Sequence, residues 1–274
     1  MPAIQEIHAK SILGKSGISD YCVNCYTGCL HNCVYCYARF MKRFSGHHEP
    51  WGQFLDIKVN APEVLLKEVK RNPPGRVFMS SVCDAYQPAE QKYELTRKCL
   101  RILLDSDFHV GILTKSKLVI RDLDVMQGHD NVEVGMTITT MDESIRSKIE
   151  PAASPSMDRI NALRQAADAG VKIYAFLGPF MPFLTDTDEQ LDRLMGEVSK
   201  LPVEYAYVDK LNARPGVWNS VAQYLHRHHP ELVENVGRVL FNQEEAEAYR
   251  HELRNRVIKI ADAYGLGVKL KIGC

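Results

Sequence analysis

Cysteine is concentrated in one short segment of this chain. Five of its eight cysteines fall between positions 22 and 36, namely Cys22, Cys25, Cys29, Cys33 and Cys36. The last three follow the spacing C-x3-C-x2-C, so their thiolates can hold three corners of a cubane iron–sulfur cluster from one loop. A tetrahedral zinc ion or a fully closed cluster needs a fourth ligand. The segment therefore predicts a metal site with one open position.

Three other interpretations of these cysteines fit less well. Disulfide bonds between them would close very small rings, and disulfides are rare in the cytosol. A zinc site built from the pairs Cys22/Cys25 and Cys33/Cys36 would have only seven residues between the pairs, which is short of the spacing in common zinc modules. The bacterial ferredoxin spacing, C-x2-C-x2-C-x3-C, has a different order. A three-cysteine site is the interpretation that remains.

The composition is that of a soluble globular protein. Hydrophobic residues make up 45% and charged residues 25% of the 274 positions, which is enough for a substantial core. Lysine plus arginine and aspartate plus glutamate both total 34, so no global charge attracts the chain to nucleic acid or to a membrane. Residues 1–6 do not resemble a secretory signal, and no apolar run approaches about 18 residues. We therefore expect a cytoplasmic protein without a membrane span, in which any nucleic-acid contact involves a local groove.

After the cysteine segment, short aliphatic runs alternate with longer segments of helical periodicity, as in repeated βα units around a parallel sheet. Strands are expected at residues 18–23, 76–81, 108–114, 132–139, 171–177 and 203–208, with a further strand-like run at 267–272. Helices are expected at 62–71, 88–104, 117–126, 156–169, 188–200, 217–224 and 243–264. Six βα units fall short of a closed eight-fold barrel. The sequence therefore predicts an α/β fold with an open, partial (β/α)6 barrel of the TIM type, and a doubly wound sheet is the alternative.

The chain shows no internal repeat, low-complexity tract or evident linker. Barrels of about 200–250 residues commonly form one domain. We therefore predict one domain, in which residues 1–215 form the partial barrel and residues 216–274 form a helical C-terminal extension packed on it. The barrel includes the cysteine loop, residues 22–37.

The cysteine loop resembles a known family signature. Cys29-x3-Cys33-x2-Cys36, with Tyr35 beside the last cysteine, is similar to the cluster loop of the radical S-adenosylmethionine (SAM) superfamily. Residues 24–39 resemble the NPYxGC…CxYCYAR signature of its spore photoproduct lyase-like branch, although Cys25 stands where the branch has proline. Further similarities lie at expected strand ends over roughly residues 20–215, namely 80–88, 113–116, Glu150-Pro151, Arg159-Ile160, 178–182 and 208–212. βα folds place their active sites at these strand ends.

This resemblance implies the cofactors and the chemistry. In the family, a partial barrel of the radical SAM type carries three thiolates that bind a [4Fe-4S] cluster, and SAM chelates the fourth iron. The reduced cluster passes one electron to the sulfonium of SAM, and the resulting 5′-deoxyadenosyl radical abstracts hydrogen from a substrate. The expected electron donor is a protein such as flavodoxin or ferredoxin. In such a site the protein orients the reactants and excludes quenchers of the radical.

The resemblance also implies roles for single residues. Cys29, Cys33 and Cys36 are the expected cluster ligands, and Tyr35 is expected to contact SAM mainly through its backbone. Lys115, at a strand end, is expected to pair with the SAM carboxylate, and an ordinary solvated lysine is the alternative. The other candidate SAM contacts carry hydroxyl or amide groups, namely Ser80, Ser81, Thr137, Thr139 and Asn212, together with the turn at 178–182.

Cys83 is the candidate catalytic residue. It stands where the branch pattern has a small hydroxyl residue. A weak S–H bond makes a good hydrogen-atom donor to a substrate radical, and spore photoproduct lyase uses a cysteine near this loop. A buried, inert cysteine is the alternative. The adjacent Asp84 is interpreted either as an acidic ligand or as part of the start of the helix near Pro88.

Two features have more than one interpretation. Cys22 and Cys25 could bind a further metal or form a redox pair, but a C-x-x-C spacing also arises by chance. The basic and aromatic run at 39–44 could follow a nucleic-acid backbone and stack on bases, or could pack as an amphipathic helix. Both features lie in or next to the cysteine loop.

Two classes of function follow from these patterns. The first is a radical SAM enzyme, a lyase or a related type, for which the branch suggests repair of a DNA thymine lesion. A peptide, an RNA or a small metabolite is an alternative substrate. The second is a non-catalytic zinc or iron–sulfur module that recognises a nucleic-acid or protein partner.

Overall fold

The centre of the molecule is an eight-stranded, mostly parallel sheet. The computed structural model describes residues 2–273, so Cys274 lies outside the described residues. The strands of this sheet are β2 (Leu13–Lys15), β3 (Tyr21–Val23), β6 (Arg76–Met79), β7 (His109–Thr114), β8 (Val132–Ile138), β9 (Lys172–Phe180), β10 (Tyr205–Lys210) and β11 (Leu270–Ile272). Their order is β11-β10-β9-β8-β7-β6-β3-β2. All neighbours are parallel except β2, which runs antiparallel to β3.

The strands β3, β6, β7, β8, β9 and β10 correspond to the six that the sequence predicts. They lie side by side in chain order, without the reversal of order that defines a doubly wound sheet. Right-handed crossovers between parallel neighbours place the connecting helices on one face of such a sheet. The predicted partial (β/α)6 barrel is therefore confirmed, and β11 extends its edge by one parallel strand.

Helices cover one face of this sheet. The α-helices of the described residues are α1 (Ala61–Glu68), α2 (Glu90–Tyr93), α3 (Leu95–Leu104), α4 (Leu123–Met126), α5 (Glu143–Ile149), α6 (Ser156–Asp168), α7 (Asp188–Val198), α8 (Val217–His228), α9 (Val233–Phe241) and α10 (Gln243–Ala263). Their 3₁₀ helices are η1 (Tyr37–Phe44), η2 (Lys117–Asp122), η3 (Pro230–Leu232) and η4 (Gly267–Lys269). The large apolar core lies where α3 packs on β7 and α6 packs on β8 and β9.

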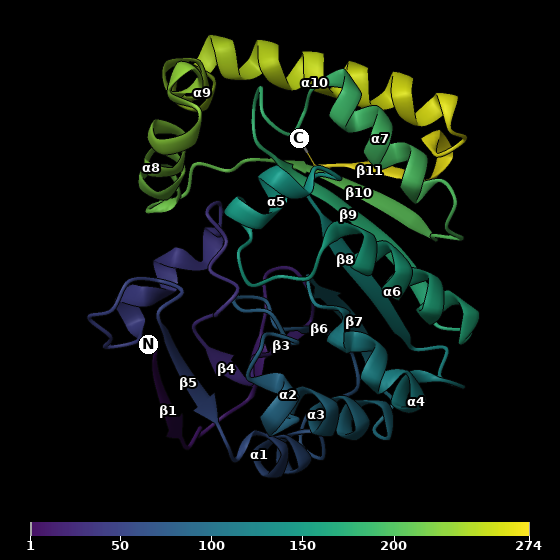
Figure 1. Ribbon diagram of the computed structural model, residues 1–274. Coiled ribbons are helices and arrows are strands. Elements are labelled where there is room, and N and C mark those ends of the chain that lie inside the picture. The colour runs from purple at the N-terminus through teal and green to yellow at the C-terminus, as the bar shows by residue number, and fades with distance from the viewer. Residues whose placement is uncertain (1, 274) are drawn as a thin grey trace.

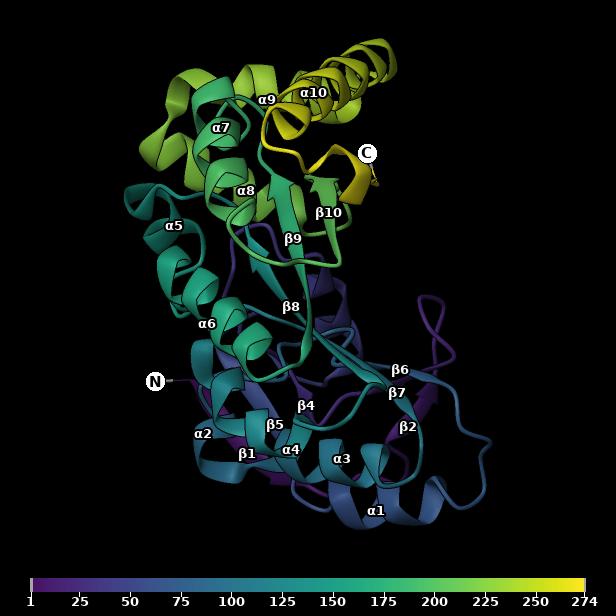
Figure 2. The same cartoon turned by 90° about the vertical axis from the view of Figure 1, so that its right-hand side faces the viewer.

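A second, smaller sheet lies next to the cysteine loop. It consists of β1 (Ala3–Ile7), β5 (Phe54–Lys58) and β4 (Tyr26–Thr27), in the order β1-β5-β4. The strand β4 is itself part of the cysteine loop and leads directly to Cys29 through Gly28. Figures 1 and 2 show β1 and β5 on one side of the main sheet and α4, α6 and α7 on the other. None of the strands expected from the sequence belongs to this sheet.

The single helix expected at 88–104 is broken in two. Glu94 has a φ of 51°, in the left-handed region, and the chain forms α2 before it and α3 after it. The break allows the buried Glu90 carboxylate to accept hydrogen bonds from the N–H groups of Thr96 (3.0 Å) and Arg97 (3.3 Å). Glu90 thus accepts hydrogen bonds from backbone N–H groups at the start of α3 that have no partner within the helix, as a helix cap does.

The C-terminal residues pack on the rest of the fold. α10 lies against α7 and α9, and β11 pairs with β10. The helices expected at 217–224 and 243–264 correspond to α8 and α10, whereas α5 and α9 were not predicted. Within residues 2–273, none of the helices combines the length and the apolar character needed to span a membrane.

Candidate functional site

The cysteine loop lies at the carboxyl ends of the barrel strands. Gln87, in the loop after β6, accepts a hydrogen bond from the Leu30 N–H at 3.0 Å and donates one to the Gly28 carbonyl at 3.3 Å. Farther along, the Val34 N–H donates to the carbonyl of Ile149, the last residue of α5, at 2.8 Å. The loop is therefore tied to the segments that follow β6 and β8, at the end of the barrel where βα folds place their active sites.

The three predicted cluster ligands have different surroundings. Cys29 and Cys33 are buried, and Cys36 is half-buried. Cys29 packs in an apolar cluster with Trp51, Cys33 packs in another with Tyr35, and Cys36 borders both. Among the described residues, no three His, Cys, Asp or Glu side chains converge as the ligands of a metal ion would. A cubane cluster requires no such convergence, because each thiolate binds a different iron atom.

Cations lie near these thiols. Burial raises the pKa of Cys33 to about 12, and the charges of Lys115 and Arg159 act in the opposite direction. Burial likewise raises the pKa of Cys36, while Lys115 and Arg39 act to lower it. Arg39 also donates to the Cys33 carbonyl at 2.9 Å. Three iron-bound thiolates bring negative charge into a buried site, so the neighbouring cations fit this donor set.

Tyr35 is anchored by a buried network of polar groups. Its hydroxyl donates to the Glu150 carboxylate and lies 3.1 Å from Thr139 Oγ1. The Thr139 hydroxyl lies 2.9 Å from Glu150 Oε1, to which it donates. Glu150 is paired with Arg159, and both side chains are fully buried. Arg159 also donates to the carbonyl of Thr137 at 2.8 Å. The network therefore joins the cysteine loop to β8 and to the residues that follow α5.

Lys115 lies directly after β7, with its ammonium 5.9 Å from the centre of the Tyr35 ring. Burial alone would lower the pKa of Lys115, but the charges of Cys33 and Glu150 raise it above its usual value. The side chain is half-buried, and its ammonium has no ion-pair partner among residues 2–273. It is therefore free to bind an anionic ligand, unlike the fully solvated lysine of the alternative interpretation.

Asp84 connects three segments at this end of the barrel. One of its oxygens accepts from the Thr114 hydroxyl (2.6 Å) and the Tyr86 N–H (2.9 Å). The other accepts from the Lys115 N–H (2.9 Å) and lies 3.3 Å from His31 Nδ1. Although burial acts to raise it, His31 and the other donors hold the pKa of Asp84 well below its usual range. Asp84 thus links the loop after β6, the end of β7 and the cysteine loop, and it does not start a helix.

The remaining candidate SAM contacts are dispersed. Ser80 is buried with a φ of 68°, and the Ser81 hydroxyl accepts a hydrogen bond from Asn24 Nδ2 at 3.3 Å. Thr137 is buried in β8. Asn212 is exposed on the loop after β10 and has no side-chain hydrogen bond within the described part of the chain. The contacts of these residues with SAM stay predictions.

Cys83 lies next to the cysteine loop. Its half-buried side chain packs against the apolar cluster that contains Cys29 and Trp51. Burial raises the pKa of the Cys83 thiol to about 12, so its sulfur keeps its proton at neutral pH. The sulfur lies 3.9 Å from Asn24 Oδ1 and next to the Ser80 hydroxyl. A thiol in this state retains the S–H bond that a hydrogen-atom donor needs.

Cys22 and Cys25 have separate surroundings. Cys25 is fully buried, and its Sγ lies 3.6 Å from the Sγ of Cys99 on α3. Cys22 is half-buried on β3 and accepts a hydrogen bond from Asn24 Nδ2 at 3.5 Å. Packing in the core accounts for Cys25, which stands where the family pattern has proline.

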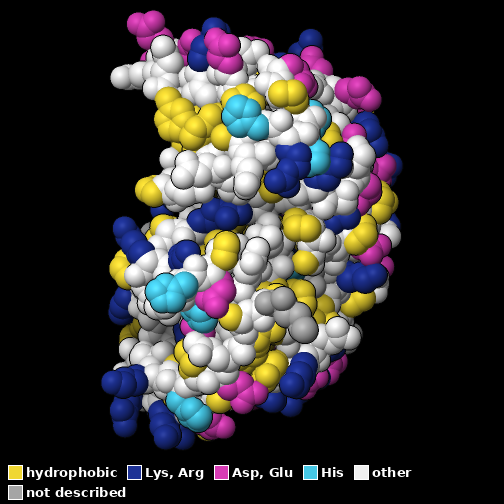
Figure 3. All heavy atoms as spheres, turned by 60° about the vertical axis from the view of Figure 1, so that its left-hand side comes forward, with side chains coloured by type: hydrophobic (Ala, Val, Ile, Leu, Met, Phe, Trp, Pro, Cys, Tyr) yellow, Lys and Arg dark blue, Asp and Glu magenta, His cyan; other side chains and the backbone are white. Residues whose placement is uncertain are grey.

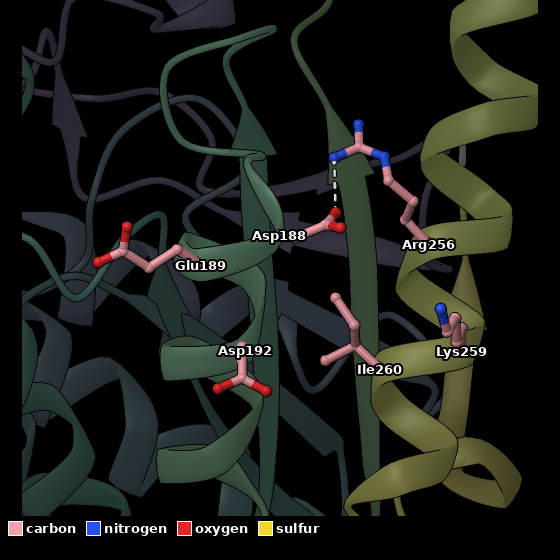
Figure 4. A pocket seen from close by; sticks show the side chains of 6 residues that line it. All are labelled: Asp188, Glu189, Asp192, Arg256, Lys259 and Ile260. Carbon is pink, nitrogen blue, oxygen red and sulfur yellow. Dashed lines mark hydrogen bonds and ion pairs between the residues drawn. The ribbon is translucent and has the colours of Figure 1, made fainter.

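A groove between α7 and α10 lies away from the cysteine loop. Its lining consists of Asp188, Glu189, Asp192, Arg256, Lys259 and Ile260. Figure 4 shows Arg256 extending from α10 toward Asp188 on α7, and the two side chains form an ion pair at 3.3 Å. Because Arg256 pairs with Asp188 across the two helices at the surface, we interpret the groove as a contact between helices rather than as the functional site.

The helix η1 carries the chain from the cysteine loop to the surface. Lys42 and Arg43 occupy its last turn, and Arg43 lies 4.5 Å from the ring of Phe44, which is 67% exposed. Lys42, Arg43, Lys210 and Arg214 form no ion pair with any of the described residues. Figure 3 shows lysine and arginine side chains among hydrophobic ones on the face that carries the N-terminal segments. Although the net charge is balanced, these four cations are therefore not neutralised by an acidic side chain of the described residues.

Comparisons of sequence connect this chain to a known superfamily. A model of the radical SAM superfamily matches residues 23–197. An uncharacterized protein of Methanocaldococcus jannaschii is 33% identical over 259 residues, which cover 93% of each chain. An uncharacterized protein of Mycobacterium tuberculosis is 30% identical over 256 residues, which cover 90% of this chain and 75% of that protein.

Comparison of structure identifies the same fold. Spore photoproduct lyase complexed with dinucleoside spore photoproduct matches with a TM-score of 0.72 and 16% identity, over 98% of this chain and 81% of that chain. A mutant of that lyase with bound SAM and dinucleoside spore photoproduct matches equally well, at 15% identity. At such low identity, the likeness establishes the fold and not the substrate.

Proposed function

The chain belongs to the radical SAM superfamily, and we propose that it is an enzyme that binds a [4Fe-4S] cluster through Cys29, Cys33 and Cys36 and cleaves SAM reductively. When bound, the cluster and SAM supply a 5′-deoxyadenosyl radical that abstracts a hydrogen atom from the substrate. One observation carries the proposal: the three thiols sit on a loop tied to the strand ends, and the unpaired ammonium of Lys115 lies close enough to influence Cys33.

The residues of this chain hold the loop in place. Asp84 contacts it through His31, and Glu150 contacts it through Tyr35. A site held by buried hydrogen bonds is preorganised, so little of the binding energy is lost in ordering it. In this proposal, Lys115 pairs with the carboxylate of SAM by a charge-assisted hydrogen bond.

Cys83 is assigned the role of hydrogen-atom donor to the substrate radical. In this step the S–H bond breaks, a C–H bond forms on the substrate, and the unpaired electron passes to the sulfur. A Cys83→Ser variant should therefore cleave SAM at the parent rate but form much less of the correct product. If the variant forms the same product in the same yield, Cys83 is not the donor.

The first substrate to test is a thymine lesion of DNA. Spore photoproduct lyase has the same fold and has been solved with such a lesion as a dinucleoside. Cations without an ion-pair partner lie on η1, at the end of β10 and in the loop after it, and they suit a phosphate backbone; they are Lys42, Arg43, Lys210 and Arg214. The test uses dinucleoside spore photoproduct that is deuterated at the abstraction site. Deuterium in 5′-deoxyadenosine and recovery of the two undamaged thymidine units support this substrate; SAM cleavage without either result excludes it.

The proposed enzyme class is tested with the protein reconstituted anaerobically with iron and sulfide. The protein should turn brown, contain about four irons per chain, and release 5′-deoxyadenosine from SAM when dithionite is added. Reduced flavodoxin or ferredoxin should replace dithionite, because the expected electron donor is such a protein. Stoichiometric zinc without any SAM cleavage would instead favour a non-catalytic module that binds a nucleic-acid or protein partner.

A further inference from the structure

Trp51 packs against the cysteine loop from the side of the smaller sheet. It lies in the turn before β5, and only 4% of it is exposed. Its ring meets Phe54 edge to face, with the centroids 5.8 Å apart. The same apolar cluster contains Cys29, and Cys36 packs against it. Trp51 therefore lies beside two of the three predicted cluster ligands.

The indole N–H of Trp51 is a buried donor without a completed hydrogen bond. Within the part of the chain that the structure describes, Nε1 is buried and has no partner at hydrogen-bond distance. Cys36 packs against the apolar cluster that contains Trp51. Burial raises the pKa of the Cys36 thiol, and the nearby indole N–H acts in the opposite direction. Burying a donor without an acceptor costs free energy, so such positions are rare in folded proteins. A neutral thiol is a weak acceptor, whereas a thiolate is a strong one.

Two close contacts fix this turn against the cysteine loop. Gly52 has a φ of +89°, and a Cβ built there would lie 2.1 Å from Asn32 Oδ1. Gly28 has a φ of +91°, and its Cβ would lie 2.5 Å from the Phe54 carbonyl oxygen. In these contacts, Gly52 and Phe54 follow Trp51 closely in the sequence, so the backbone next to the indole is held close to the cysteine loop.

We propose that Trp51 donates its indole N–H to the sulfur of Cys36 when this sulfur is bound to iron, and that this hydrogen bond raises the reduction potential of the cluster. This inference rests on the proposed function, because it requires a cluster at Cys36. A hydrogen bond to a ligand sulfur stabilises negative charge, and the reduced cluster is the more negative form. Trp51 is thus a positioning residue that acts through Cys36, and its loss should make the cluster harder to reduce.

The test compares reduction potentials in reconstituted protein without SAM. Trp51→Phe keeps a ring but loses the donor, and the matched control Trp218→Phe changes the chain's other tryptophan, which lies on α8 against Phe241. An EPR-monitored redox titration should give a more negative midpoint potential for Trp51→Phe and no change for Trp218→Phe. Equal potentials in the two variants, with parental iron content, would overturn the assignment.

A second variant covers the case in which Trp51→Phe loses iron through poor packing. Replacing Trp51 by benzothienylalanine, in which sulfur replaces the indole N–H, preserves the shape of the ring. This variant should hold a full cluster, show the same negative shift and lose one exchangeable proton coupled to the cluster in ENDOR spectra. A parental potential in it would overturn the Trp51 assignment but not the enzyme class. Absence of a cluster in the parent protein would overturn both.

Discussion

The cysteine loop is held from two sides by different means. On the barrel side, Tyr35 is bonded to Glu150, which is paired with Arg159, and all three side chains are buried. On the side of the smaller sheet, the contacts at Gly28 and Gly52 leave no room for even a Cβ atom. Removing a charged side chain therefore disrupts the anchor on the barrel side, whereas adding a methyl group disrupts the anchor on the side of the smaller sheet. The same loop is thus held by buried charged groups on one side and by close packing on the other.

The largest effect should come from breaking the buried pair. Arg159→Met leaves the Glu150 carboxylate buried without its partner, so it should lower the free energy of unfolding by about 3–5 kcal/mol. Urea unfolding of the metal-free protein, followed by circular dichroism, measures this loss. The control Lys200→Met removes one partner of the surface pair with Glu197 and should cost less than about 1 kcal/mol. Equal losses in the two variants would show that the pair is not an anchor.

The packing anchor is tested by adding one methyl group. Gly52→Ala should cost about 1–2 kcal/mol for the left-handed backbone, together with a further loss because the methyl group displaces Asn32. Gly46→Ala is the matched control, because Gly46 has a φ of +73° but nothing lies within 4 Å of its Cβ position. The difference between the two free energies of unfolding measures the contact itself. If that difference is zero, the turn before β5 does not fix the loop.

On the barrel side, Lys115 is a cation that takes part in neither anchor. Lys115 has no ion-pair partner among the described residues, so Lys115→Met should leave the free energy of unfolding within about 1 kcal/mol of the parent value. The same variant should bind SAM roughly tenfold more weakly, or worse, because a hydrogen bond between charged groups is lost. Calorimetric titration of the reconstituted protein with SAM measures this change. Unchanged affinity would separate Lys115 from the SAM carboxylate.

The side of the smaller sheet contains a pH-dependent contact. His47 stacks on Phe54 with centroids 4.3 Å apart, and its Nε2 lies 2.7 Å from Asp56 Oδ1. Burial alone would lower the pKa of His47, but Asp56 and Glu49 raise it above its ordinary value. A pKa that is higher in the folded state means that protonated His47 stabilises the fold. This contribution is complete below the ordinary pKa of about 6.5 and is lost as the pH rises through the folded-state pKa.

The stabilising effect of His47 is measured as the difference in free energy of unfolding between the parent and His47→Gln. The difference should be largest near pH 5.5 and should shrink as the pH rises toward 9. Asp56→Asn should remove most of this pH dependence, because Asp56 is the main group that raises the pKa. A difference that does not change with pH would mean that His47 contributes by stacking alone.

Features with a local signature could be predicted from the sequence. The spacing of Cys29, Cys33 and Cys36 is such a signature, and the six barrel strands follow from aliphatic runs at regular intervals. The break at Glu94 could not be predicted, because it depends on Glu90 turning back to cap the next helix. Local periodicity does not indicate such a contact.

Contacts between residues far apart in the sequence could not be predicted, because they leave no local pattern in it. The smaller sheet pairs β1 with β5 across about fifty residues, and the buried strand β5 contains Asp56, which weakens its apolar signal. Glu150 and Arg159 belong to a resemblance in the sequence, but nothing there indicates that they meet Tyr35 in the core. Trp51 belongs to no motif, and only the fold brings it to Cys36.

In the proposed function, Cys29, Cys33 and Cys36 together hold a cubane cluster at which SAM is cleaved. The most direct measurement is the Mössbauer spectrum, with iron content and 5′-deoxyadenosine yield, of the parent and of single alanine variants of these residues. Cys22→Ala is the control within the same loop. The parent and Cys22→Ala should show a [4Fe-4S] spectrum, about four irons per chain and SAM cleavage, and the other variants should lose all three. A full cluster and undiminished SAM cleavage in any of the three variants would contradict this assignment of the cluster ligands.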